Sequence, residues 1–154
     1  MPNKATILFA YANPENDLKL ENEYNPIRKA SYADKARRIA SVPQAIFNTQ
    51  IADLSTTFLS FKEQLAVFHF AGHGDHHILS LQDKDIPTHP FNDLLELQPN
   101  LHLVFLNGCN TDLQARELVT KIPVVIGTNN VIDDEVVSQF SSPFTDLLQK
   151  FIKY

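Results

Sequence analysis

The chain has 154 residues, with 13 Lys and Arg against 18 Asp and Glu, so its formal net charge at pH 7 is −5. Apolar residues make up 44% and charged residues 20%, which excludes an intrinsically disordered chain and fits one domain with a sizeable core. The acidic balance argues against a nucleic-acid-binding protein, and no apolar run approaches the ~18 residues of a membrane-spanning helix.

The first half of the chain predicts strands that alternate with helices. The expected elements are a strand over 6–12, a helix over about 18–38, a short strand over 44–48 and an amphipathic helix over 51–65. Asn13-Pro14 ends the first strand, because proline lacks the amide hydrogen. Pro26 is expected to break the first helix or to lie in a first turn. Asn48 or Thr49 is the expected cap of the second helix.

The second half continues the alternation. The expected elements are a strand over 66–71, a small hairpin that includes 78–81, a helix over 91–97, a strand over 101–106, a helix over 111–121 capped by Asn110 or Thr111, a strand over 123–127 and a last amphipathic helix from about 133. Two of these strands, 66–71 and 101–106, are almost continuously apolar, as is typical of strands buried on both faces of a parallel sheet. The pattern predicts an α/β fold with a mostly parallel central sheet flanked by helices.

Glycine is rare, and its placement is informative. Average usage of roughly 7% would give about 11 glycines, whereas the chain has four, each directly downstream of a strand-like run: Gly72, Gly74, Gly108 and Gly127. Glycine lets the backbone turn tightly or approach a ligand closely. Ligands of such sheets bind beyond the carboxyl ends of the strands. We therefore expect the site around segments 13–14, 72–74 and 107–109, with 127–129 as a wall.

The residues beside these glycines carry the chemistry of a cysteine peptidase. His73 follows one expected buried strand and Cys109 follows another, so the two emerge side by side if these strands are neighbours. A nearby imidazole activates a thiol as general base or ion-pair partner and later protonates the leaving amine. The backbone N–H groups of Gly74 and Cys109 are the expected donors to the oxyanion of acyl transfer.

Each of these two residues also has a structural interpretation that the sequence leaves open. An unpaired cysteine is among the most buried residue types and is often inert. A histidine after a strand is commonly packed or solvent-facing. The alternative to an enzyme is therefore a catalytically silent signalling or scaffold module that acts through protein–protein contacts.

The compartment follows from the cysteine usage. The single cysteine excludes an internal disulfide, which fits a reducing cytoplasm. The N-terminal residues run directly into a strand-like segment without a signal-peptide pattern. We therefore expect a cytoplasmic protein that binds neither membranes nor nucleic acid directly.

Four motifs in order resemble those of CHAT domains, which belong to the caspase-like cysteine peptidases of clan CD. Segment 67–74, Val-Phe-His-Phe-Ala-Gly-His-Gly, resembles their histidine motif, and segment 104–111, Val-Phe-Leu-Asn-Gly-Cys-Asn-Thr, resembles their cysteine motif. The usual Leu-Asn-Ala-Cys-Asn-Ser differs only by Gly108 and Thr111, and neither change removes a catalytic atom. Two further motifs resemble those of bacterial members. The N-terminal motif consists of segments 11–14 and 20–23, and the motif after the nucleophile consists of segments 125–128 and 132–134 and of Phe140. A further departure is Pro143, where an aromatic residue is usual.

The resemblance implies a three-layer caspase-like (caspase-hemoglobinase) fold and a cysteine endopeptidase. Cys109 would be the nucleophile and His73 the general base and acid, in regulated processing of a protein substrate for bacterial defence or stress signalling. Members of the family are often joined to a sensor or effector partner or module. They commonly continue into further strands, so residues 1–154 are expected to be one domain that lacks such C-terminal elements or is cut from a longer protein.

The expected substrate-pocket residues are Asn13, Asn107 and Asp134. The resemblance places Asp134 near the pocket, where it would favour a basic P1 residue. The alternative for Asp134 is a charge cluster over 133–135 at a helix N-terminus, favoured by the helix dipole.

Metal and phosphate sites are weaker interpretations. Four histidines and an aspartate fall within nine residues: His69, His73, Asp75, His76 and His77. A zinc pattern of the His-x-His-x-Asp-His type fails because position 71 is alanine, and His69 fits a hydrogen-bonded core position better. No phosphate-binding loop is present, since Gly72-His73-Gly74 is too short for one. We therefore expect neither a metal nor a cofactor.

Overall fold

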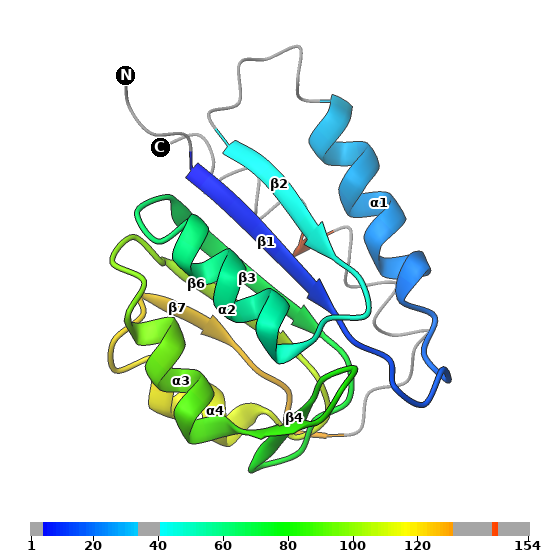
Figure 1. Cartoon of the computed structure of the whole chain (residues 1–154), viewed down its shortest axis with the longest axis vertical. Helices are drawn as coiled ribbons and strands as arrows, with labels where there is room; N and C mark the ends of the chain where they lie inside the picture. The colour runs from blue at the N-terminus through cyan, green and yellow to red at the C-terminus, as the bar shows by residue number, and fades with distance from the viewer. Residues whose placement is uncertain (1–4, 34–40, 131–142, 145–154) are drawn as a thin grey trace.

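The computed structural model describes residues 5–33, 41–130, 143 and 144 (Figure 1). The strands are β1 (Ala5–Tyr11), β2 (Ser41–Ile46), β3 (Leu65–Ala71), β4 (Ile78–Ser80), β5 (Asp85–Pro87), β6 (Leu103–Asn107) and β7 (Val124–Ile126). The helices are α1 (Leu20–Ala33), α2 (Ile51–Ser60), α3 (Thr88–Glu96) and α4 (Asp112–Leu118). No helix in this part of the chain combines the length and the apolar character needed to cross a membrane.

The central sheet has five strands in the order β2-β1-β3-β6-β7, and every neighbouring pair is parallel. This arrangement confirms the predicted α/β fold with a parallel sheet. β4 and β5 form a separate antiparallel pair, which confirms the predicted hairpin. The chain leaves β1 toward β2 and then returns to the other side of β1 to form β3, so the direction of strand addition reverses there. Open α/β sheets bind ligands at such a reversal, beyond the carboxyl ends of the strands.

Two apolar layers cover the sheet, one on each face. Phe68 and Phe70 of β3 belong to the first layer, which also holds buried side chains of α2, α3 and α4. In Figure 1 these three helices lie over the near face of the sheet. Val67 and Ala71 belong to the second layer, against which Leu20 and Tyr24 at the start of α1 pack. β1, β3 and β6 are therefore buried on both faces, as their near-continuous apolar sequences predict.

Two details differ from the sequence predictions. Pro26 lies inside α1 and does not break it, although an interior proline removes one backbone hydrogen bond of the helix. The N-cap of α2 is Gln50, whose backbone N–H donates to Asp53 Oδ2 at 2.9 Å. Thr49 lies one residue before this cap, and its hydroxyl donates to the carbonyl of Tyr11 at 2.9 Å. The helix predicted from about residue 133 falls outside the described residues.

Candidate active site

The register of β3 and β6 brings the two candidate catalytic segments together. Ala71 pairs with Asn107, and the N–H of Gly72 donates to the carbonyl of Asn107 at 3.2 Å. His73 and Cys109 are thus at equivalent positions, each the second residue after this pair. Both side chains are accessible, since Cys109 is half-buried and the His73 side chain is 29% exposed. The predicted adjacency of the two segments is therefore confirmed.

Close backbone contacts explain the glycines at this edge. A Cβ atom on Gly108 would lie 3.0 Å from the carbonyl oxygen of Gly72 and 3.5 Å from the nitrogen of Gly74. A Cβ atom on Gly72 would lie only 2.6 Å from the carbonyl oxygen of Ala12, at the end of β1. The three segments that follow β1, β3 and β6 therefore pack backbone against backbone, which side chains at these positions would prevent.

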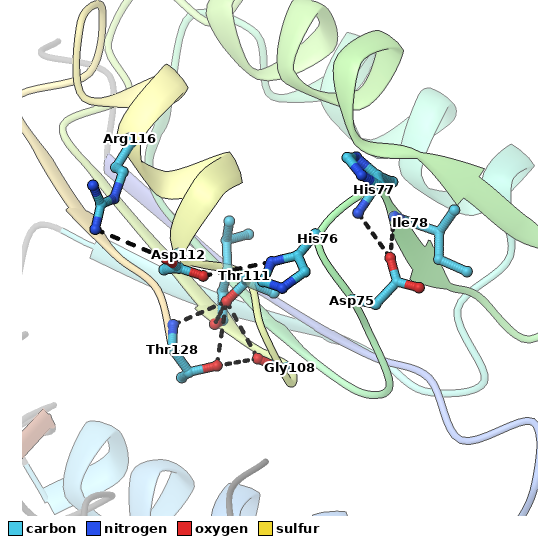
Figure 2. A network of polar contacts seen from close by, with 10 residues as sticks. Asp75, His76, His77, Ile78, Gly108, Thr111, Asp112, Arg116 and Thr128 are labelled. Atoms are coloured by element: carbon cyan, nitrogen blue, oxygen red, sulfur yellow. Dashed lines mark hydrogen bonds and ion pairs between the residues drawn. The ribbon is translucent and has the colours of Figure 1, made fainter. Parts of the chain in front are cut away.

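The turn that carries Cys109 is held from inside by one hydroxyl. The buried Thr111 Oγ1 donates to the carbonyl of Leu106 at 2.9 Å and accepts from the N–H of Thr128 at 3.0 Å. The hydroxyl of Thr128 in turn contacts the carbonyl of Gly108 (Figure 2). Asn110 has a φ of 53°, a left-handed conformation that asparagine tolerates better than most residues. The segment after β7 is thus a wall of this turn, as predicted.

The loop after His73 is held by its own polar contacts. Asp75 Oδ1 accepts from the backbone N–H of His77 at 2.7 Å and of Ile78 at 3.0 Å (Figure 2). These bonds to the ionised form hold the pKa of Asp75 below its ordinary value. His76 Nδ1 lies 3.7 Å from Asp112 Oδ1 at the start of α4. The loop is thereby connected to the helix that follows Cys109.

The closest partner of His73 is a residue that the sequence analysis did not identify. Asp17 Oδ1 lies 2.7 Å from His73 Nε2. The contact joins the loop after β1 to the loop after β3, at the point where strand addition reverses. A carboxylate on Nε2 fixes the ring orientation and places the ring proton there, which leaves Nδ1 free to accept a proton.

Asn13 shapes the loop that holds Asp17. Its side-chain Nδ2 donates to the carbonyl of Leu18 at 3.0 Å, and its Oδ1 accepts from the N–H groups of Asp17 at 3.2 Å and Leu18 at 3.3 Å. Asn16, with a φ of 55°, completes the turn. These bonds occupy the side chain that we predicted to line a substrate pocket. No local pattern marks Asp17 in the sequence, because its partner His73 lies 56 residues away.

The contact between Asp17 and His73 gives a prediction about pH. The hydrogen bond with His73 is the main cause that lowers the pKa of Asp17 below its ordinary value. A carboxyl with a lowered folded-state pKa contributes stability above its unfolded pKa and loses that contribution as the pH falls through the lowered value. The contact should therefore persist at pH 5 and disappear only below the ordinary aspartate pKa of about 3.9.

The prediction is checked by NMR titration of the Asp17 carboxyl carbon. In the wild-type chain the inflection should fall below the ordinary value, and in His73→Ala it should move upward toward that value. An inflection that stays at the same pH in both chains would contradict it.

Asn107, the second predicted pocket residue, faces the interior of the fold. Asn107 is buried, and its Nδ2 donates to Glu23 Oε2 of α1 at 3.0 Å, so its side chain faces away from solvent. His69 is fully buried with its Nε2 2.7 Å from Glu23 Oε1, which fits the predicted core histidine. Asp134 lies outside the described residues.

One group of side chains could hold a metal ion. Glu15, Asp17 and His73 each offer a ligand atom within 4.8 Å of the other two. Two of the three are exposed carboxylates, and Asp17 is already the partner of His73. Carboxylates and imidazole suit several divalent ions, but no further feature of the described residues points to one, so we assign no metal here.

Comparison of the sequence with protein families and with curated proteins found no relative. The function must therefore be argued from the residues at this edge of the sheet.

Proposed function

We propose that the chain is a cysteine-type endopeptidase in which Cys109 is the nucleophile and His73 is the general base and acid. The observation that carries the proposal is the pairing of Ala71 with Asn107, which gives the histidine and the thiol equivalent positions on adjacent parallel strands. A thiol and an imidazole that a common sheet edge brings together are the minimal parts of this chemistry.

Asp17 would complete the site as the residue that orients the imidazole. With Asp17 on Nε2, the Nδ1 atom of His73 accepts the thiol proton as Cys109 Sγ attacks the carbonyl carbon of a peptide bond. The C–N bond then breaks, and His73 passes this proton to the leaving amine. Water hydrolyses the resulting thioester and restores the thiol.

Two backbone N–H groups are available for the oxyanion. Among the described residues, none accepts a hydrogen bond from the N–H of Gly74 or of Cys109. Gly74 directly follows the imidazole, and its nitrogen approaches the Gly108 backbone. Donors that are already in place stabilise the developing charge without reorganisation.

The resemblance to CHAT domains supports a more specific proposal. The finer fold would be the three-layer caspase-like fold, and the reaction would be selective processing of a protein substrate. The biological setting would be bacterial defence or stress signalling with a sensor or effector partner. The chain's parallel sheet with apolar layers on both faces is compatible with that fold.

The test is the rate at which iodoacetamide alkylates Cys109 between pH 5 and pH 9. Cys109 is the single cysteine, so no other thiol contributes to the signal. An ordinary free thiol with a pKa near 8.5 is only about 3% thiolate at pH 7. We therefore expect His73→Ala to slow alkylation at pH 7, by up to about 30-fold. A library of peptides would then identify the cleaved bond.

The matched control is His89→Ala, which removes an exposed histidine of α3 whose ring lies 3.6 Å from Asp93. This variant should react like the wild-type chain. Equal rates for wild type, His73→Ala and His89→Ala would contradict the proposal. A catalytically silent signalling or scaffold module would then be the better interpretation.

A further inference from the structure

A buried polar cluster lies under the candidate active site on the second face of the sheet. It consists of Glu23 from α1, His69 from β3 and Asn107 from β6. Glu23 Oε1 lies 2.7 Å from His69 Nε2, and Glu23 Oε2 accepts from Asn107 Nδ2 at 3.0 Å. All three side chains are buried: Glu23 is 4% exposed, His69 0% and Asn107 8%.

The surroundings of this cluster are apolar and aromatic. The His69 ring has four ring neighbours, with centroid distances from 4.7 to 6.1 Å: Phe9, Tyr11, Phe105 and Phe144. Burial, and then the charge of Glu23, raise the pKa of Tyr11. Placing a carboxylate here is costly unless it is paired and hydrogen-bonded. The first turn of α1 favours a negative charge. Asn107 donates to one oxygen of Glu23, and the ring nitrogen Nε2 of His69 lies 2.7 Å from the other.

Asn107 connects this cluster to both candidate catalytic segments. Its backbone carbonyl accepts from the N–H of Gly72, which directly precedes His73. Its chain neighbour is Gly108, which directly precedes Cys109. Its side chain has Glu23 as a partner from a different element, 84 residues away in the sequence. A displacement of Asn107 would therefore move the two segments relative to each other.

We infer that Glu23 is a positioning residue that acts through Asn107 to hold Cys109 in register with His73. The inference rests on the proposed function and extends it to a residue that contacts neither reacting group. The Glu23 carboxylate fixes the side-chain amide of Asn107. It thereby sets the orientation of the end of β6, where the turn that carries Cys109 begins. Reactivity of this kind is sensitive to displacements of about 1 Å, which can cost up to about 100-fold in rate.

The experiment exchanges the donor and the acceptor of this hydrogen bond. Asn107→Asp places a second carboxylate against Glu23, and Glu23→Gln in the same chain restores a bond from the glutamine amide to Asp at position 107. The glutamine oxygen still faces His69. The readout is the His73 dependence, defined as the alkylation rate of Cys109 at pH 7 divided by that of the same chain with His73→Ala.

We expect Asn107→Asp to lower the His73 dependence on the order of tenfold, or to abolish it. The double variant should recover it to within about threefold of the wild-type value. Unfolding would also lower this ratio, because it exposes Cys109 without regard to His73, so the ratios are compared only among variants that circular dichroism shows to be folded at the assay temperature. If Asn107→Asp does not fold, Glu23→Ala replaces it and should lower the ratio in the same way.

The chain offers a matched control in α3 and α4. Asn92 Nδ2 donates to Glu117 Oε2 at 2.9 Å, which is the same pair of groups between α3 and α4, and neither residue belongs to β3 or β6. Asn92→Asp should lower the unfolding temperature and leave the His73 dependence unchanged.

The outcomes separate the two proposals. A His73 dependence near one in the wild-type chain overturns the proposed function, and the positioning role falls with it. A clear wild-type dependence that Asn107→Asp leaves intact, or that the double variant fails to restore, overturns the positioning role alone. Recovery in the double variant, with no change in Asn92→Asp, supports it.

Discussion

Replacing Phe68 with alanine is expected to lower the free energy of unfolding by about 3–5 kcal/mol, the usual cost of removing a fully buried aromatic ring. Phe68 has no exposed surface and lies in β3. Its ring centroid is 5.4 Å from that of Phe58 in α2 and 5.7 Å from that of Phe91 in α3. The ring therefore attaches two helices to the strand that ends before His73.

Denaturant unfolding of the two chains measures this effect. The midpoint should fall while the slope of the transition stays constant. The control is Leu59→Ala in α2, whose side chain is 77% exposed and whose loss should change the free energy by no more than about 0.5 kcal/mol. Comparable losses in the two variants would show that this layer is not the core of the domain.

The fold is largely predictable because its elements have strong local patterns. The apolar runs around 66–71 and 101–106 lie in β3 and β6, where successive side chains enter the two apolar layers alternately. Strands of this kind cannot face water on either side, so the sequence alone indicates a covered parallel sheet. Helix ends were less predictable, since capping depends on single bonds such as the one from Gln50 to Asp53.

The candidate catalytic pair was predictable for a related reason. Gly72, Gly74 and Gly108 stand out in a glycine-poor chain, and Gly72 and Gly108 lie where backbones pack closely. His73 and Cys109 are adjacent to them in sequence. A topological rule about strand ends was therefore enough to expect the two segments side by side.

The supporting residues were not predictable, because their partners are distant in sequence. Asp17 lies 56 residues from His73 and Glu23 lies 84 residues from Asn107, so no local pattern connects them. Asn107 was expected in a pocket since it precedes Gly108, but the alternation of strand side chains turns it toward the buried face. Only the packed arrangement of α1 against the sheet reveals these contacts.

Replacing Gly72 with alanine is expected to disturb the site more than alanine at Gly74 or Gly108. The new Cβ atom would lie 2.6 Å from the carbonyl oxygen of Ala12 and 2.9 Å from the Phe70 ring. The backbone oxygen can retreat only if the loop after β1 moves, and that loop carries Asp17. We expect a loss of about 1–3 kcal/mol of unfolding free energy and a His73 dependence of alkylation that falls toward one.

Gly74→Ala is the matched control for this prediction. Its Cβ atom would meet the terminal methyl group of Leu79 at 3.1 Å, and a side-chain end can turn aside. The substitution also keeps the backbone N–H that we assign to the oxyanion. The prediction fails if Gly72→Ala matches Gly74→Ala in both unfolding free energy and His73 dependence. If only Gly72→Ala loses both, the contact of Gly72 with Ala12 couples the stability of the sheet edge to the reactivity of the thiol.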